Sequence, residues 1–305
     1  MHSMSWRCSL QIVSRNSCVC YASPWPVLGI PRKRFISQSS AMASYKSADW
    51  NATKYMQFGD ERTRPARELL AQISLTSPKR VIDLGCGPGN STELLAAKFP
   101  DSRLTGLDFS PNMLEMARKV LPDLEFALTD LSTYTPNEEV DVFFSNAVFQ
   151  WIPGEQRIPI IARLLESQPS GSIFAFQVPD NFMEPSHAAM RETAAEGPWA
   201  ATLAAANPAR ESVPSPQVLY DALKPLCSRV NIWHTYYYHI LENHRAIIDW
   251  VSSTGLRPFV ESLPEDQKKG FLEEYLKRIE KAYMPLVDGR VMLTYPRLFA
   301  VLHRA

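Results

Sequence analysis

The sequence predicts an α/β protein with a mostly parallel sheet, a last strand that turns back antiparallel, and a helical lid. Three observations predict this fold class. Short apolar runs alternate with helical segments between about residues 79 and 179, the pattern of a parallel sheet with connecting helices. A glycine-rich turn, "DLGCGPGN", joins the first apolar run to the first helical segment. Two long apolar runs come late in the chain with helical segments between them, which favours a closing antiparallel strand.

The strands and helices of the first half follow one another regularly. Ser110 stands before Pro111 at the start of a helical segment, and a serine cap followed by proline is a common helix start. Asn90 or Ser91 can cap the helix that follows the glycine turn. We expect strands at 79–85, 102–108, 124–130, 140–147 and 171–179, and helices at 90–99, 110–121 and 158–167.

The second half has a different rhythm. Residues 180–224 are rich in Ala, Pro and Glu and predict helices with breaks. Apolar runs at 230–241 and 291–305 predict two long strands, which brings the sheet to seven, and helices are expected at 243–252 and 265–283. The expected organisation is a leader at 1–41, an N-terminal helical lid at 42–78, a core at 79–179, and lid helices with closing strands at 180–305.

The composition is that of a globular chain with enough residues for a full core. It has 305 residues, of which 45% are hydrophobic and 21% charged, and no apolar run approaches a membrane span. The first 41 residues hold five of the 32 basic residues and no acid, so the rest carries 27 basic against 32 acidic residues. Because the chain beyond residue 41 is net negative, it has no general attraction for nucleic acid or anionic lipid. We expect the protein to bind neither nucleic acid nor a membrane, and to be a monomer.

The leader is rich in Arg and Ser, and the first acid of the chain is Asp49. This composition is typical of a mitochondrial transit peptide, and "RKRFISQSS" resembles the cleavage region of such peptides, so we expect the mitochondrial matrix. The alternative is a start at Met42 and a cytoplasmic protein. Cys86 and Cys227, the cysteines beyond the leader, have no metal-ligand spacing, which argues against disulfides and a metal site.

The spacing of the glycines limits which classes of ligand the turn can bind. Gly85, Gly87 and Gly89 read G-x-G-x-G, and Asn90 stands where a dinucleotide-binding fingerprint needs its third glycine. The lysine of a phosphate-binding P-loop is absent as well. A tight connection between strand and helix would explain the glycines alone.

Three acids accompany the turn. Asp83 lies two positions before the first glycine, and Asp108 and Asp130 close the second and third expected strands. An acid at the end of the second strand can accept both ribose hydroxyls of an adenosine. Asp130 can meet an adenine amino group.

This combination resembles the class I S-adenosylmethionine-dependent methyltransferases, whose first motif is an acid–x–G–x–G–x–G turn. The resemblance implies a Rossmann-like sheet of seven strands and S-adenosylmethionine as the cofactor. The residues that it assigns to cofactor binding are Asp83, Gly85, Gly87, Gly89, Asp108, Asp130 and Asn146.

Blocks outside the cofactor half resemble one family in particular, the bacterial trans-aconitate methyltransferases. These blocks are "SADWNATKYMQFGDERTRPARELL", "SNAVFQWIP", "VPDNFMEPSHAAMRE", "TYYYHIL", "AIIDWVSSTGLRPF" and "YPRLFAV". The resemblance implies a reaction that moves a methyl group to a carboxylate oxygen of trans-aconitate, a small tricarboxylate, and gives a monomethyl ester. Because a carboxylate is ionised at neutral pH, no general base is required, and we expect no catalytic residue of that kind.

The substrate requires cations and hydrogen-bond donors for the carboxylates that do not react. The blocks supply the expected substrate-binding residues, which are Trp50, Tyr55, Arg64, Gln150, Trp151, Tyr237, His239, Arg257 and Arg297, with Arg62 and His187 as further candidates. Each has a structural alternative. Trp50 and Trp151 can pack as core or lid anchors, and Arg64 can pair with Glu68 on a solvated face. Arg257 fits that alternative less well, because neighbouring glycine and proline residues place it in a turn.

Two other functions stay open. The first is methyl transfer to another small carboxylic acid or to a quinone-type acceptor, which the leader favours but which would call for an apolar pocket. The second is a non-catalytic cofactor-binding protein that assists assembly of a complex. Such proteins often lose the glycine turn or the ribose acid, and both are intact here.

Overall fold

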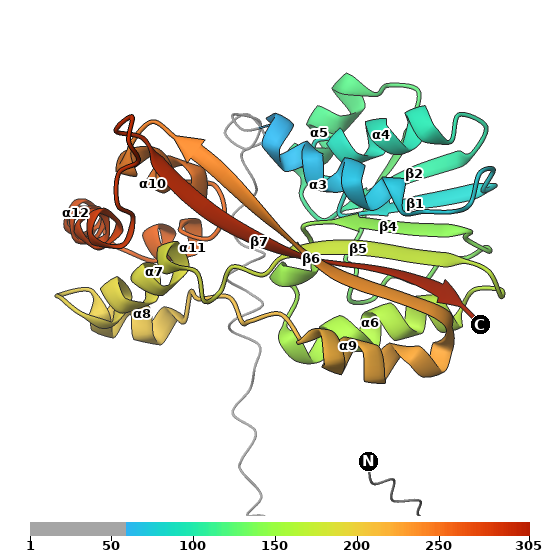
Figure 1. Ribbon diagram of the computed structural model, residues 1–305. Helices are drawn as coiled ribbons and strands as arrows, with labels where there is room; N and C mark the ends of the chain where they lie inside the picture. Colours follow the sequence, from blue (N-terminus) through green and yellow to red (C-terminus); the bar gives the residue numbers. More distant parts are fainter. Residues whose placement is uncertain (1–58) are drawn as a thin grey trace, which may run out of the picture. The chain divides into compact units, whose positions relative to one another are not determined.

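The computed structural model describes residues 59–305, and its elements alternate as predicted (Figure 1). The first half contains α3 (Gly59–Ala71), β1 (Arg80–Leu84), α4 (Asn90–Lys98), β2 (Arg103–Asp108), α5 (Pro111–Val120), β3 (Glu125–Leu128), β4 (Val142–Asn146), η1 (Phe149–Trp151), α6 (Gly154–Glu166) and β5 (Ile173–Pro179). The second half contains α7 (Pro185–Ala195), α8 (Ala200–Ala206), α9 (Pro216–Leu223), η2 (Lys224–Leu226), β6 (Cys227–Leu241), α10 (His244–Ser252), α11 (Arg257–Glu261), α12 (Glu265–Ala282) and β7 (Val291–Arg304).

The sheet has seven strands in the order β3-β2-β1-β4-β5-β7-β6, which confirms the predicted fold class. Strands β1 to β5 pair in parallel, whereas β7 is antiparallel to both β5 and β6. The strand order reverses between β1 and β4. In sheets of this kind ligands bind outside the carboxyl ends of the strands at that point.

Helices cover both faces of the sheet. Helices α3, α4 and α5 lie on one face, and α6 and α9 lie on the other (Figure 1). Alternate residues of β1 show the two faces: Val81 packs in the core cluster that includes Leu69 of α3, and Ile82 packs in the one that includes Leu164 of α6. Burial on both faces explains why the central strands read as continuous apolar runs.

Strands β6 and β7 have 15 and 14 residues and run beyond the core strands (Figure 1). The pairing of β5 with β7 ends at Pro179 opposite Arg297, whereas β6 stays paired with β7 as far as Leu241 opposite Val291. Residues 291–296 of β7 therefore belong to a two-stranded ribbon. Helices α7, α8, α10, α11 and α12 pack around this ribbon and form a helical part next to the core.

Two local predictions are corrected and one is confirmed. Ser110 caps α5 as predicted, and its side chain accepts from the amide of Met113 at 3.2 Å. The cap of α4 is Gly89, in place of Asn90 or Ser91, because the helix already begins at Asn90, and the Ser91 hydroxyl donates to Asp83 instead. Strand β3 ends at Leu128, so Asp130 lies two residues past the strand and not at its end.

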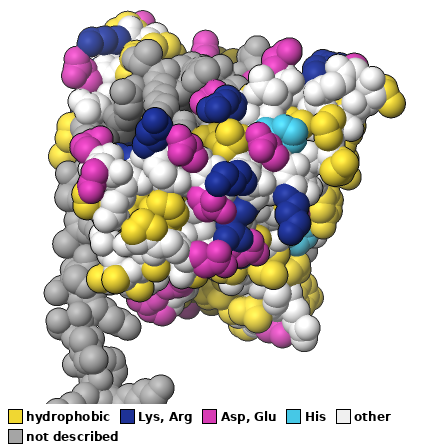
Figure 2. Space-filling view, turned by 90° about the vertical axis from the view of Figure 1, so that its left-hand side faces the viewer, with side chains coloured by type: hydrophobic (Ala, Val, Ile, Leu, Met, Phe, Trp, Pro, Cys, Tyr) yellow, Lys and Arg dark blue, Asp and Glu magenta, His cyan; other side chains and the backbone are white. Residues whose placement is uncertain are grey.

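The end of the molecule that carries the helical part shows mixed charges (Figure 2). Basic and acidic side chains alternate there over a surface with apolar patches between them. On α12, Lys277 pairs with Glu274 at 3.0 Å, and Arg278 reaches Glu192 of α7 at 3.3 Å. Pairing of this kind leaves no large field of one sign on this face. Within residues 59–305 no helix has the length and apolar character that a membrane crossing requires.

Candidate functional site

The glycine turn after β1 is required partly by packing and partly by an open space. Gly85, Gly87 and Gly89 have φ values of 74°, 55° and 101°, a region that L-residues rarely adopt. A Cβ at Gly85 would lie 2.3 Å from Val148 Cγ2, and one at Gly89 would lie 3.2 Å from Leu121 Cδ1. A Cβ at Gly87 would meet no atom of the described residues within 4 Å. Gly87 is therefore the glycine that faces a space which a ligand can fill.

Asp108, the last residue of β2, is joined to this turn. Its Oδ2 accepts from the amide of Gly87 and its Oδ1 from the amide of Ser110, each at 2.9 Å. The residue is 8% exposed. A carboxylate in this position is an acceptor that can meet the hydroxyls of a ligand lying against Gly87.

Asp83 is buried in β1 below the turn. Its Oδ2 accepts from the hydroxyls of Ser91 and Thr92, both at 2.7 Å, which ties the strand to the first turn of α4. Its Oδ1 has no hydrogen-bond partner within residues 59–305. Burial, opposed by the two hydroxyls, raises the pKa of Asp83 to about 6. A buried carboxylate oxygen without a donor is the partner that a cationic ligand group requires.

The other two residues expected to bind cofactor have different surroundings. Asp130 accepts from the amide and hydroxyl of Ser132 at 3.0 and 2.7 Å, which forms a turn at the sheet edge. Asn146 ends β4, and its Oδ1 accepts from Gln177 Nε2 at 2.7 Å. Gln177 Oε1 in turn accepts from Arg297 at 3.2 Å. Asn146 therefore connects the carboxyl end of β4 with an arginine of β7.

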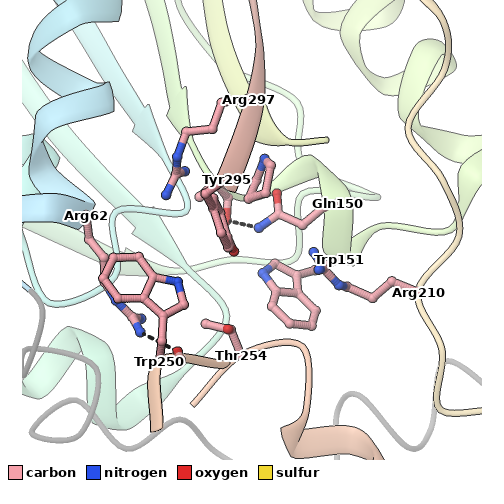
Figure 3. A pocket seen from close by; sticks show the side chains of 10 residues that line it. Arg62, Gln150, Trp151, Arg210, Trp250, Thr254, Tyr295 and Arg297 are labelled. Atoms are coloured by element: carbon pink, nitrogen blue, oxygen red, sulfur yellow. Dashed lines mark hydrogen bonds between the residues drawn. The ribbon is translucent and has the colours of Figure 1, made fainter. Parts of the chain in front are cut away.

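A pocket opens at the carboxyl ends of β4 and β5, where Ala147, the residue after Asn146, and Pro179 line it (Figure 3). It is partly open to solvent. The residues that line it are Arg62, Ala147, Gln150, Trp151, Pro179, Arg210, Trp250, Thr254, Tyr295 and Arg297. Three are arginines from distant segments, Arg62 on α3, Arg210 between α8 and α9, and Arg297 on β7, and no acid lines the pocket in the described part of the chain.

Two of these arginines are oriented by neutral acceptors and aromatic rings. Arg62 donates to Ser253 Oγ at 2.9 Å and to the Trp250 carbonyl at 3.4 Å. Arg297 is 4% exposed, and its guanidinium lies 5.0 Å from the ring centroid of Tyr295. These contacts fix the direction of each guanidinium, and the pocket is therefore cationic.

Arg210 is held in the same way. Its guanidinium stacks on the ring of Trp151 at 4.9 Å. Its Nη2 lies 3.2 Å from Nε2 of the buried His187 and 3.3 Å from Asn181 Oδ1. Sequence reasoning missed Arg210. The signal available in the sequence was a cation in a proline-containing break after a helical segment, and in the structure this loop begins where Asn207 (φ 45°) ends α8.

Gln150 and Trp151, both expected to bind substrate, follow β4 and line the pocket. Gln150 Nε2 donates to the carbonyl of Ala147 at 2.6 Å, and Gln150 Oε1 has no partner within the described residues. Ala147 has a φ of 59°, an unusual value for alanine. Strain of this kind is often kept where a side chain or carbonyl must be aimed.

Three other predicted residues lie behind the wall of the pocket. Arg64 is on the exposed side of α3 and pairs with Glu68 at 2.8 Å, which is the structural role given above as the alternative to substrate binding. Its guanidinium also lies 5.0 Å from the ring centroid of Tyr237. The buried Tyr237 donates its hydroxyl to Glu68. His239 packs on Trp250 with ring centroids 4.2 Å apart, and burial lowers its pKa to about 4, so it is neutral. None of the three lines the pocket.

Arg257 is not brought to the pocket. It begins α11 and pairs with Glu261 one turn later at 2.7 Å. The neighbouring Gly255 serves another residue, because a Cβ there would lie 2.7 Å from His187 Nε2. Trp50 and Tyr55, also expected to bind substrate, lie outside the described residues.

The comparisons with known proteins agree with this geometry. The family model of a methyltransferase domain matches residues 81–168. The trans-aconitate 2-methyltransferase of Rhodopseudomonas palustris (strain BisB18) is 50% identical over 254 residues, 83% of this chain and 98% of that protein. That of Rhizobium rhizogenes is 49% identical over 252 residues, with the same coverage. The solved YcgJ protein of Bacillus subtilis matches with a TM-score of 0.51 at 11% identity, over 79% of this chain and 99% of that one, a likeness of fold alone.

The same comparisons overturn one expectation from the sequence. The matching relatives are proteins of bacteria, which have no mitochondria, so the prediction of a mitochondrial location is wrong. The leader at 1–41 lies outside the described residues. Its Arg- and Ser-rich composition is a weak signal, because a short stretch can lack acids without being recognised by an import system.

Asp83 generates a prediction about stability. Its pKa is higher in the folded chain than in the unfolded one, so the folded state keeps the proton between about pH 4 and pH 6 and this contribution falls as pH rises through that window. At about pH 7.5 the unliganded Asp83→Asn protein should be more stable than the native one, by on the order of 2–3 kcal/mol. Urea unfolding of both proteins at about pH 7.5 and pH 4 measures the difference in their free energies of unfolding. This difference should be smaller at about pH 4. A difference independent of pH would show that the charge of Asp83 is not its cause.

Proposed function

The chain belongs to the trans-aconitate 2-methyltransferase family, and on that premise we propose that it transfers the methyl group of S-adenosylmethionine to a carboxylate oxygen of trans-aconitate. It is an S-adenosylmethionine-dependent methyltransferase with a small-molecule substrate. The observation that carries the choice of substrate is the pocket at the ends of β4 and β5, where three arginines converge. A small polyanion is the ligand that such a lining suits.

The residues around the glycine turn fit the cofactor. The open space at Gly87 would receive the adenosine, Asp108 would accept from its ribose hydroxyls, and Asp83 Oδ1 would accept from the ammonium of its methionine part. When bound, S-adenosylmethionine supplies an electrophilic methyl group on a positively charged sulfur. Asp130 and Asn146 stay proposed members of this site, Asn146 through its link to Gln177.

The pocket would hold the carboxylates that do not react. Arg297 on β7 and Arg62 on α3 both line the pocket, and each can donate to a carboxylate (Figure 3). An arginine on the reacting oxygen would stabilise a charge that the reaction consumes, which would slow the reaction. We therefore assign these arginines to the non-reacting groups.

No side chain needs to move a proton. The reacting carboxylate has a pKa near 4 and is ionised at neutral pH. One of its lone pairs forms the new C–O bond while the C–S bond breaks, and the products are an ester and S-adenosylhomocysteine. The chain contributes by aligning the reactants and by excluding water, with Trp151 and Trp250 as apolar walls. The cationic lining argues against a quinone-type acceptor.

The substrate proposal is tested by a panel of acceptors. Purified protein with S-adenosylmethionine should form S-adenosylhomocysteine fastest with trans-aconitate, more slowly with other tricarboxylates, and least with dicarboxylates. The physical reason is that each carboxylate lost removes a charge-assisted contact, which corresponds to about 10-fold or more in kcat/KM. A faster reaction with an apolar acceptor would contradict the proposal.

Gly87→Val should block the cofactor, because its side chain would occupy the open space beside Asp108. We expect the affinity for S-adenosylmethionine to fall by about 100-fold or more in calorimetry. Gly171→Val is the matched control, because Gly171 also has a positive φ (88°) and open space but lies in a turn before β5. Both variants carry a backbone strain of about 1–2 kcal/mol. Equal cofactor affinity in the two would remove Gly87 from the site.

Arg297→Lys should weaken the use of trans-aconitate while sparing the cofactor. An ammonium cannot reproduce the fork of a guanidinium, so we expect kcat/KM to fall by about 30- to 100-fold. Arg163→Lys is a control for the loss of a structural arginine, since Arg163 donates to loop carbonyls beside α6. Arg257→Lys should cost less than about threefold in kcat/KM, because Arg257 does not line the pocket. A larger loss at Arg257 than at Arg297 would favour the sequence prediction over the pocket.

A further inference from the structure

A second hollow adjoins the pocket. The two share Gln150, Pro179 and Arg210, and the second is also lined by Asn181, His187 and Arg191 among others. One acid, Glu211, lies at this hollow, and its carboxylate accepts from the amide of Gly154 at 2.8 Å, at the start of α6. The function proposed above uses the first pocket and leaves the buried polar groups of the second one unexplained.

Asn181 lines this hollow and carries a buried donor. The residue is 2% exposed, and its Oδ1 lies 3.3 Å from Arg210 Nη2. Because an arginine only donates, the amide oxygen must face Arg210 and the amide nitrogen must point elsewhere. That nitrogen, Nδ2, has no hydrogen-bond partner within residues 59–305. A buried donor left in this state destabilises the protein unless a ligand accepts from it.

His187 orients the guanidinium of Arg210 as a neutral hydrogen-bond acceptor. Its Nε2 lies 3.2 Å from Arg210 Nη2 and must be the acceptor, so the ring proton is on Nδ1, which donates to Ser186 Oγ at 3.1 Å. Burial and the charges of Arg210 and Arg191 hold the pKa of His187 well below its usual value. Gly255 leaves the room that this approach requires, since a Cβ there would touch Nε2. A neutral acceptor orients the guanidinium and leaves its positive charge undiminished.

We propose that Arg210 and Asn181 together form a second carboxylate subsite, which binds one of the two non-reacting carboxylates while Arg297 and Arg62 bind the other. The subsite rests on the proposed function, because its ligand is the tricarboxylate named there. Arg210 and Asn181 Nδ2 supply adjacent donors to the two oxygens of one carboxylate. His187 is a positioning residue that acts through Arg210. The subsite makes the enzyme distinguish tricarboxylates from dicarboxylates.

The first test is Asn181→Asp, which keeps the shape of the side chain but puts an anion beside Arg210. Activity is measured with trans-aconitate and with the three dicarboxylates that each lack one of its carboxylates, namely itaconate, glutaconate and mesaconate. For trans-aconitate, kcat/KM should fall by about 100-fold or more, since a donor becomes a repelling charge. For the one dicarboxylate that lacks the group bound at this subsite, the change should stay below about threefold.

The matched control is Asn243→Asp. Asn243 caps α10 by accepting from the amide of Ala246 at 3.2 Å, and aspartate caps a helix equally well. This variant should leave all four substrates unchanged. Equal losses on every substrate in Asn181→Asp, with the control unchanged, would overturn the subsite.

The second test separates a positioning role of His187 from a structural one. His187→Leu removes the acceptor and should raise KM for trans-aconitate by about 10-fold while kcat changes little. His187→Gln, which can accept through Oε1, should restore most of the loss. In an Arg210→Met background, His187→Leu should add nothing further. A parallel fall of kcat, KM and thermal stability, without rescue by glutamine, would overturn the role.

Failure of the proposed function would be visible separately. If the native enzyme methylates none of the tricarboxylates, the proposed function fails, and the subsite is then decided by calorimetric titration of trans-aconitate in the presence of S-adenosylhomocysteine. Binding to Asn181→Asp that is weaker by about 10-fold or more than to the native protein supports the subsite. Equal binding to both, or no binding to either, overturns it.

Discussion

The site depends on the way strand β7 is shared between two partners. Along the core it pairs antiparallel with β5, and at Arg297 opposite Pro179 this pairing ends while β6 continues alongside. The amide of Asp180 makes the last contact, to the carbonyl of Pro296 at 2.9 Å. Because β7 leaves the sheet there, Tyr295 and Arg297 stand directly outside the carboxyl ends of the parallel strands, where this class of fold binds its ligands.

A single hydrogen-bonded line joins this point to the glycine-rich half. It runs from Arg297 through Gln177 to Asn146 across three adjacent strands, with distances of 3.2 and 2.7 Å. Gln177 and Arg297 are buried, so the line is held rigidly by the strands that carry it. The arginine on the substrate side is therefore positioned relative to the cofactor side by the sheet itself and does not depend on a mobile loop.

The charges of the site follow a common design. Its arginines are oriented by neutral acceptors, such as Gln177 for Arg297 and His187 for Arg210, and by aromatic rings. Such neutral partners fix direction without adding negative charge, whereas the exposed Arg64 is paired with a glutamate. Asp83 is the counterpart on the cofactor side, a buried carboxylate whose charge works against the fold and suits a cationic ligand group. Departures from what stability favours are expected at functional sites.

The sequence by itself determined the features that depend on neighbours in the chain. Alternating apolar runs predict the strands, the serine before Pro111 predicts a helix start, and the glycine turn with Asp108 predicts the cofactor edge, because periodicity, capping and positive φ are local properties. Which arginines meet in the pocket was decided only by the tertiary structure. The turn around Arg257 predicted that its side chain reaches the substrate, and yet Arg257 pairs with Glu261 in its own helix. Arg210 lies in a loop that predicted no site, and it lines the pocket. The reason is physical: the direction of a side chain in space follows from long-range strand pairing and from packing across the β6–β7 ribbon, and no spacing within one segment contains it.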